Sequence, residues 1–162
     1  MTEKDRIAIV SAVRTPIGRF GGSLKDIPVI DLGALVATEC MRRVGIAPQE
    51  IERVVVGQNI QLTPRGNPAR PVLLKAGIPI TSNDYAVNMN CASGLRAMTC
   101  LAQDILLDDV SVGLAVGMEN MSQTPYLLEK ARWGYRLGDG QLIDFLANYI
   151  LGDAGPMAEN VA

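Results

Sequence analysis

The stretch "DYAVNMNCASGLRAM", residues 84–98, decides which fold the chain is expected to adopt. It starts with a short apolar-rich run. It ends inside a longer segment, residues 94–107, whose apolar side chains recur at helical spacing. The small residues Ala92-Ser93-Gly94 lie between the two. We therefore predict a strand that turns directly into a helix, which is the basic unit of α/β proteins.

Strand-like and helix-like segments alternate on both sides of this stretch. Short β-branched or apolar runs predict strands at residues 7–10, 53–57, 84–90 and 111–118. Helices are predicted after Asp31, over residues 67–77 and over residues 94–107. Aspartate often begins helices and glycine often ends them, so Asp31 and Gly45 are predicted to mark the two ends of the first helix. The order βαβαβαβ predicts an α/β fold with a mainly parallel sheet.

The pattern changes after Thr124. The residues that follow hold most of the late aromatic side chains and no clean strand, which indicates an inserted or lid-like region instead of more sheet. We therefore divide the chain into residues 1–123 and residues 124–162. The final "MAENVA" has the composition of a helix that is just starting, so we expect the full-length form to continue beyond it.

Composition narrows the function classes. The 162 residues carry a formal net charge of −2, which provides no basic field for nucleic acid or an anionic membrane surface. The sequence has neither a transmembrane-length apolar run nor the pattern of a secretory signal at its start. Three cysteines without CxxC spacing, and no histidine, predict neither a metal site nor a disulfide framework. We expect a reducing, cytoplasmic location, no nucleic-acid partner and no membrane.

Cys91 is the candidate nucleophile, because it would leave a strand and enter a helix within a few residues. The backbone N–H groups and the dipole of a helix start favour a thiolate and can hold an oxyanion. The alternative is a small hydrophobe in the core, which is how cysteine usually behaves. The local pattern leaves both interpretations open for Cys91. Cys40 and Cys100, each on a helix among apolar neighbours, are expected to belong to the core.

Several segments together resemble the thiolase family, the acyl-CoA C-acyltransferases. Residues 88–98, "NMNCASGLRAM", are similar to the family's nucleophile motif. Other similar segments are "VSAVRTPIGRFGGSLKDIPVIDLG" (10–33), "GNPARPVLLKAGIP" (66–79), "VGLAVGMENMSQTPY" (112–126) and "ARWGYRLGD" (131–139). The resemblance covers essentially the whole chain. It implies an incomplete thiolase N-terminal α/β domain at residues 1–123 and the start of a loop domain at residues 124–162.

The resemblance implies a mechanism in which Cys91 attacks an acyl-CoA thioester and carries the acyl group. A second acetyl-CoA then loses a proton and attacks the acyl carbon in a Claisen condensation. In reverse, the same site cleaves a 3-oxoacyl-CoA with coenzyme A. Coenzyme A is thus expected as a substrate, with no permanently bound cofactor. The resemblance also implies fatty acid metabolism and a homodimer or tetramer in the full-length form.

Part of the machinery for this chemistry is missing from the sequence. In the thiolases, which this chain resembles, a C-terminal half of the protein provides the histidine base and a second catalytic cysteine. The chain has no histidine, and neither Cys40 nor Cys100 matches that second cysteine. The chain by itself is therefore expected to be inactive. Three alternatives to an acyl-CoA C-acyltransferase remain: an inactive fragment, a split subunit that needs a C-terminal partner, or a ketoacyl synthase-like condensing enzyme. The segments "GNPAR" and "GMENMS" argue against the last of these.

Two positions depart from the family pattern. Where the family often reads HMG-x-TAEN, residues 153–162 read "DAGPMAENVA", so the histidine near the CoA thioester is lost and the CoA contacts stay unassigned. Asn90 stands directly before Cys91, where an apolar residue or glutamine is frequent. It is expected either to alter the acyl-chain preference or to hydrogen-bond to a neighbouring loop.

Overall fold

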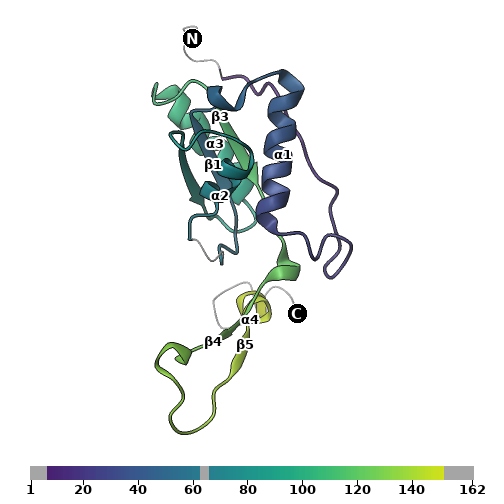
Figure 1. Ribbon diagram of the computed structural model, residues 1–162, viewed down its shortest axis with the longest axis vertical. Coiled ribbons are helices and arrows are strands. Elements are labelled where there is room, and N and C mark those ends of the chain that lie inside the picture. The colour runs from purple at the N-terminus through teal and green to yellow at the C-terminus, as the bar shows by residue number, and fades with distance from the viewer. Residues whose placement is uncertain (1–6, 63–65, 152–162) are drawn as a thin grey trace. The chain divides into compact units, whose positions relative to one another are not determined.

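The computed structural model describes residues 7–62 and 66–151, without the side chains of residues 149–151 (Figure 1). The chain divides into two compact units, Met1–Asn120 and Met121–Ala162. The expected helix start at "MAENVA" and the departure at residues 153–162 lie outside the described residues.

The first unit is built on a parallel sheet with the strand order β2–β1–β3 (Figure 1). The central strand is β1 (Arg53–Gly57), and its neighbours are β2 (Asn83–Val87) and β3 (Gly113–Gly117). In this register Val55 lies opposite Tyr85 on one side and Ala115 on the other. The predicted α/β fold with a parallel sheet is confirmed.

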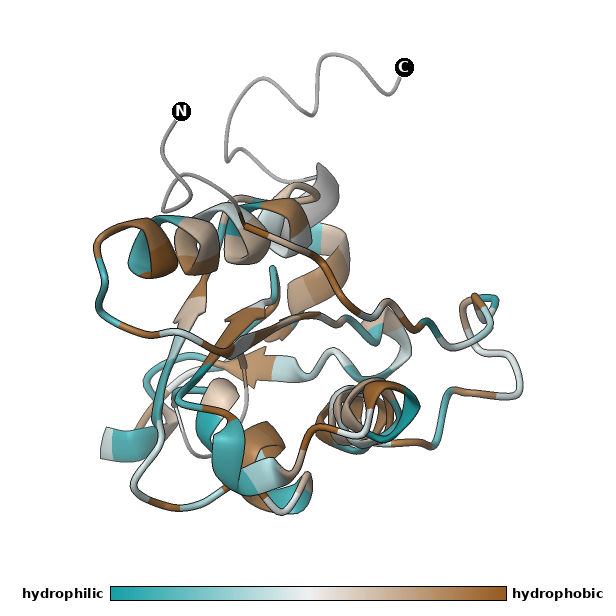
Figure 2. Ribbon diagram, turned by 90° about the horizontal axis from the view of Figure 1, so that it is seen from above, coloured by the Kyte–Doolittle hydropathy of each residue, from teal (hydrophilic) through white to brown (hydrophobic). Residues whose placement is uncertain are grey.

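Helices cover both faces of β1. Val54 and Val56 share a core cluster with α1 (Val29–Val44) and α2 (Ala69–Lys75), whereas Val55 packs with α3 (Ser93–Leu106). The apolar strands therefore lie between helices, as Figure 2 shows. A continuous valine run suits such a strand, because neither face of it meets water. All three helices overlap the ranges predicted from the sequence, and α1 begins two residues before Asp31.

The ends of α1 follow from local residues. Pro28 occupies the cap position, and Asp31 lies in the first turn instead of capping the helix as predicted. A carboxylate there is still favourable, because it faces the positive end of the helix dipole. Gly45 ends the helix as predicted: it takes a φ of 70°, and its N–H donates to the carbonyl of Arg42.

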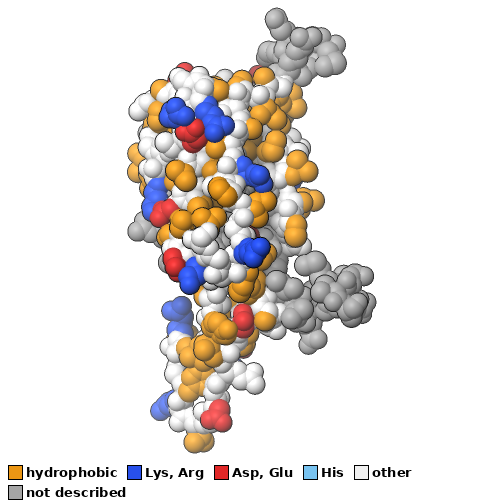
Figure 3. Space-filling model, turned by 90° about the vertical axis from the view of Figure 1, so that its right-hand side faces the viewer, with side chains coloured by type: hydrophobic (Ala, Val, Ile, Leu, Met, Phe, Trp, Pro, Cys, Tyr) orange, Lys and Arg blue, Asp and Glu red, His pale blue; other side chains and the backbone are white. Residues whose placement is uncertain are grey.

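The strand predicted at residues 7–10 is wrong, because the structure has no strand there. Ile9 and Val10 are 72% and 63% exposed. Among the described residues the sheet consists of β2, β1 and β3 alone, and this β-branched run pairs with neither edge of it. The longer segment that leads from here to α1 runs along the side viewed in Figure 3, where many hydrophobic side chains lie at the surface.

The second unit contains a two-stranded antiparallel sheet of β4 (Tyr126–Leu128) and β5 (Leu142–Asp144), followed by α4 (Phe145–Leu151). The prediction of no clean strand after Thr124 is therefore wrong. Strands of three residues are too short for alternation to become visible in a sequence. None of the helices in the described ranges combines the length and hydropathy needed to cross a membrane.

Candidate active site

Cys91 lies between the carboxyl end of β2 and the first residue of α3, where the sequence predicts it. Its side chain is exposed, so the alternative that Cys91 is a buried core residue does not hold. Cys40 and Cys100 are half-buried and pack against the two core clusters on opposite faces of the sheet. The structure therefore brings neither of them to Cys91, and all three thiols are free.

The backbone before Cys91 makes a tight turn. Asn90 has a φ of 51°, which non-glycine residues rarely adopt, although asparagine tolerates it better than most. Ser93 supports this turn from the start of α3, because its N–H and its Oγ both donate to the Asn90 carbonyl at 3.0 and 2.6 Å. The Ser93 Oγ also accepts the N–H of Met89 at 2.9 Å. The turn is thus tied to the helix that follows it.

Glycines allow α3 to approach the sheet beneath Cys91. A Cβ on Gly57 would lie 2.2 Å from the carbonyl oxygen of Ser93, which no side chain can accommodate. A Cβ on Gly117 would lie 3.2 Å from the Cα of Gly94. Close packing against a helix therefore explains the strand glycines of β1 and β3. The first turn of α3 sits directly on the ends of both strands.

A network of polar groups joins the carboxyl ends of all three strands, and we call it the nucleophile-turn network. After β3, the Glu119 carboxylate accepts the N–H groups of Asn59 and Ile60 at 2.9 and 3.2 Å. After β2, Asn88 donates from Nδ2 to the carbonyl of Asn59 at 2.7 Å and accepts the N–H of Asn90 at Oδ1, at 3.0 Å. The network members are Asn59, Ile60, Asn88, Asn90, Ser93 and Glu119.

Sequence reasoning missed Asn88 and Glu119 as parts of this site. A signal was present, because Glu119 directly follows the strand predicted at residues 111–118 and Asn88 lies near the end of the strand predicted at residues 84–90. The carboxyl ends of parallel strands meet at one edge of a sheet. Which of these residues would hydrogen-bond to which could not be read from spacing.

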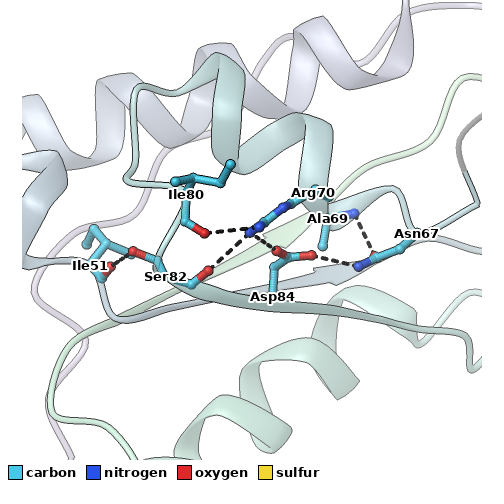
Figure 4. A network of polar contacts seen from close by, with 7 residues as sticks. All are labelled: Ile51, Asn67, Ala69, Arg70, Ile80, Ser82 and Asp84. Atoms are coloured by element: carbon cyan, nitrogen blue, oxygen red, sulfur yellow. Dashed lines mark hydrogen bonds and ion pairs between the residues drawn. The ribbon is translucent and has the colours of Figure 1, made fainter.

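A second network lies at the amino end of β2 (Figure 4). The Asp84 carboxylate accepts from Arg70 Nη1 at 2.8 Å and from Asn67 Nδ2 at 2.6 Å. Arg70 also donates to the carbonyls of Ser82 and Ile80 at 3.2 and 3.0 Å. These contacts join α2 to β2, and they lie at the end of the strand opposite to Cys91. We assign them a structural role.

A third polar group fastens the far end of α3. Asp104 on α3 accepts from Arg53 Nη1 at 2.9 Å and from the Tyr85 hydroxyl at 2.8 Å. Burial, followed by the hydrogen bond to Asp104, raises the pKa of Tyr85, so its hydroxyl stays protonated and donates. The hydrogen bond that Arg53 donates to Asp104 raises the pKa of Arg53. Both ends of α3 are thus bound to the sheet.

The arrangement around Cys91 can support nucleophilic chemistry. The thiol is exposed and directly precedes the start of a helix of 14 residues, so it lies near the positive end of the helix dipole. No imidazole is available to act as a base, because the sequence has no histidine. The described residues also contain no group of three or more Cys, Asp or Glu side chains that could hold a metal ion.

Comparison with known proteins identifies the family of this site. The sequence profile of the family described as "Thiolase, N-terminal domain" matches residues 7–162. The chain is 43% identical to the acetyl-CoA acetyltransferase of Chromobacterium violaceum over 96% of its own length and 41% of that relative. It is 40% identical to the acetyl-CoA acetyltransferase of Cupriavidus necator, again over 96% of its length and 41% of the relative.

Solved structures agree. The fold superposes on the Bacillus anthracis acetyl-CoA acetyltransferase with a TM-score of 0.82 and 39% identity, covering 88% of this chain and 36% of that one. It superposes on the human mitochondrial 3-ketoacyl-CoA thiolase with a TM-score of 0.81 and 34% identity, covering 87% and 36%. The chain spans about two fifths of the curated relatives, at 41% of their length. With the family profile matched along nearly its whole length, the chain belongs to the thiolase family, of which it represents the N-terminal domain.

Proposed function

We propose that this chain carries the acyl-accepting nucleophile of an acyl-CoA C-acyltransferase, and that Cys91 is that nucleophile. The single observation that carries the proposal is the exposed thiol at the start of α3, at the carboxyl edge of the parallel sheet of a thiolase domain. Relatives named acetyl-CoA acetyltransferase support acetyl-CoA as a substrate. They also weigh against a ketoacyl synthase-like enzyme.

In the acylation step, the Cys91 sulfur attacks the carbonyl carbon of an acyl-CoA. A new thioester bond forms to Cys91, the bond to the CoA sulfur breaks, and free CoA leaves with the proton that the Cys91 thiol gave up. Backbone N–H groups near the start of α3 would stabilise the oxyanion of the tetrahedral intermediate in this proposal, other than those of Ala92 and Ser93, which donate to the carbonyls of Met89 and Asn90. This step needs only groups near Cys91, apart from the carrier of the proton.

In the condensation step, a second acetyl-CoA loses a proton from its α-carbon, and that carbon attacks the acyl group on Cys91. A carbon–carbon bond forms, the thioester to Cys91 breaks with Cys91 leaving as a thiolate, and 3-oxoacyl-CoA is released. The proton removed from the α-carbon then returns through the base to that thiolate. Acid–base assistance to such a proton transfer contributes roughly 10²–10⁴-fold. The chain has no histidine to provide it, so we propose that the base comes from a C-terminal half, as the family resemblance implies.

The exposed apolar face of α3 supports the proposal that a further layer of structure packs on this helix in a full-length thiolase. Ala97 and Leu101 face the sheet and are buried, whereas Leu95, Met98 and Leu106 are 64%, 42% and 52% exposed. A helix that is apolar on two faces is typical of one buried between two layers. We propose that the remainder of a full-length thiolase covers this second face. The chain alone then acquires at most one acyl group, slowly, without turnover.

We further propose self-association through β2, as a homodimer or tetramer of the full-length form. In the described sheet β2 pairs with β1 on one side only, so its other edge can accept a strand. Unpaired edges of this kind are adhesive. Sedimentation velocity over a range of concentrations tests this, and a monodisperse monomer at high concentration contradicts it.

A fusion tests the catalytic proposal. The chain is placed before the C-terminal three fifths of the Chromobacterium violaceum relative, and thiolysis of acetoacetyl-CoA is followed for the chain alone and for the fusion. Turnover is expected only in the fusion, and Cys91→Ala abolishes it. Cys100→Ala, a matched change of a half-buried thiol, leaves most of it.

The two outcomes separate the remaining alternatives. Turnover by the chain alone, free of host thiolase, overturns the missing-base proposal. A fusion that folds, shown by its circular dichroism, and stays inactive favours an inactive fragment.

A further inference from the structure

We infer that Asn88 is a positioning residue for Cys91, an inference that rests on the function proposed for that cysteine. The Asn88 side chain bridges two segments at the carboxyl edge of the sheet. Its Oδ1 accepts the N–H of Asn90 at 3.0 Å, and its Nδ2 donates to the carbonyl of Asn59 at 2.7 Å. One end thus holds the residue directly before Cys91, and the other end holds the segment that follows the central strand.

The turn needs this support because its backbone is strained. Asn90 has a φ of 51°, a conformation that persists only where its surroundings hold it. Ser93 holds the carbonyl side of Asn90 through two hydrogen bonds, and Asn88 holds its N–H side. If the Asn88 side chain is removed, one of the two supports is lost and residue 90 can relax toward negative φ, which turns Cys91 away from the helix start.

The far end of the bridge is firmly anchored. Asn59, which accepts from Asn88, donates its own N–H to the Glu119 carboxylate after β3 at 2.9 Å. The position of Cys91 is therefore coupled to the segments that follow the central strand β1 and the opposite edge strand β3, and not only to β2. This matters for reactivity, because displacing a reacting atom by about 1 Å can cost about 100-fold in rate.

Substitutions can separate the contributions of the two hydrogen bonds that the Asn88 side chain makes. Asn88→Ala removes both hydrogen bonds. Asn88→Ser keeps a neutral acceptor that can bind the N–H two residues later, as serine does in turns, but it is too short to reach Asn59. Asn90→Gly removes the strain itself, because glycine adopts positive φ without cost. Support from Asn88 then becomes unnecessary.

The experiment measures iodoacetamide alkylation of the 162-residue chain at neutral pH by peptide mapping, with Cys100 as the internal reference for global opening. Asn88→Ala is expected to lower the Cys91 rate about tenfold, the size of effect expected when the side-chain hydrogen bond to the Asn90 N–H is lost, with the Cys100 rate unchanged. Asn88→Ser is expected to recover most of the loss. In the Asn90→Gly background, Asn88→Ala should lower the Cys91 rate by less than about threefold. The effects of the two substitutions would then be non-additive, as expected for two residues that act through one turn. In the fusion with the C-terminal portion of the Chromobacterium violaceum relative, kcat should fall by a similar factor while KM stays unchanged.

Each contrary result has a distinct meaning. An unchanged Cys91 rate in Asn88→Ala, with Cys91 still the fastest thiol of the parent chain, overturns the role of Asn88 and leaves Cys91 in place. A rise of the Cys100 rate in Asn88→Ala shows general loosening and reduces Asn88 to a structural residue. Equal losses with and without Asn90→Gly show that Asn88 does not act through Asn90. A parent chain in which Cys91 is not the fastest thiol overturns the proposed nucleophile itself.

Discussion

The two ends of β2 are both held by side-chain networks, and they differ in what those networks surround. At the amino end, the Asp84 carboxylate binds Arg70 and Asn67, so a charge and its partners satisfy one another around a side chain that is only 7% exposed. At the carboxyl end, the neutral amide of Asn88 and the hydroxyl of Ser93 bind backbone groups next to the exposed thiol of Cys91.

This difference separates a stabilising role from a positioning role. A closed network of charges fastens α2 to β2 and leaves no reactive group exposed. A network that binds backbone on either side of a reactive side chain controls where that side chain points. Breaking the network around Asp84 should therefore lower stability without changing the reactivity of Cys91. Breaking the nucleophile-turn network should mainly change the reactivity of Cys91.

The largest effect is expected where α3 meets the carboxyl end of the sheet. Gly57→Ala would place a Cβ 2.2 Å from the Ser93 carbonyl oxygen, so the first turn of α3 must move. We expect the free energy of unfolding to fall by at least about 3 kcal/mol, measured by urea denaturation. Gly94→Ala is the matched control, because its Cβ would meet only the Cα of Gly117 at an ordinary 3.5 Å. Equal stability of the two variants would contradict the close packing.

The amino end can be broken by Asp84→Ala. Arg70 and Asn67 then lose their shared carboxylate, and we expect the free energy of unfolding to fall by about 2 kcal/mol, because the Arg70 side chain is 39% exposed and partly regains water. The alkylation rate of Cys91 should stay unchanged. Asp26→Ala, on an exposed turn, serves as the control. A slower Cys91 in Asp84→Ala would show that the two ends of β2 are coupled.

The exposed thiol provides a third measurement. Under brief iodoacetamide treatment near neutral pH, Cys91 should react about tenfold faster than Cys40 or Cys100, equivalent to about 1.4 kcal/mol. The reason is that Cys91 is exposed at a helix start, whereas the other two pack against the core. Peptide mapping identifies the order. Earlier labelling of Cys40 or Cys100 would argue against the assignment of the nucleophile.

The smallest effect is expected at a surface ion pair, which sharpens the contrast with Arg70–Asp84. Hydrogen bonds from Arg42 and then Arg43 lower the pKa of Glu39 from 4.5 to about 2. A lowered pKa contributes stability that is present above pH 4.5 and disappears as the pH falls toward 2. The melting temperature of Glu39→Gln should therefore lie slightly below that of the parent at pH 6 and converge with it near the acid limit. Exposed pairs contribute little, so a large difference would be unexpected.

Prediction from sequence succeeded where the signal was local. The α3 helix and the position of Cys91 before it follow from a small-residue turn and helical spacing within about 15 residues. Gly45 ends α1 because a helix end needs a residue that accepts positive φ. The strand expected at residues 7–10 failed for the opposite reason, because β-branched residues favour a strand but cannot form one without a partner.

The site shows the same division. The sequence left two explanations open for Asn90, acyl-chain preference or a bond to a neighbouring loop. The structure adds a backbone reason, because asparagine is among the few residues that tolerate its φ of 51°.

The sequence by itself determined that a cysteine would stand between a strand and a helix in an α/β thiolase domain, because helix spacing, caps and small-residue turns act between near neighbours in the chain. Only the tertiary structure decided that this cysteine is exposed while two others are packed, and that Glu119, Asn59 and Asn88 meet beside it. These contacts join residues 60 and 29 positions apart. Contacts over such separations form only after parallel strands have aligned their carboxyl ends, and no local pattern encodes that alignment.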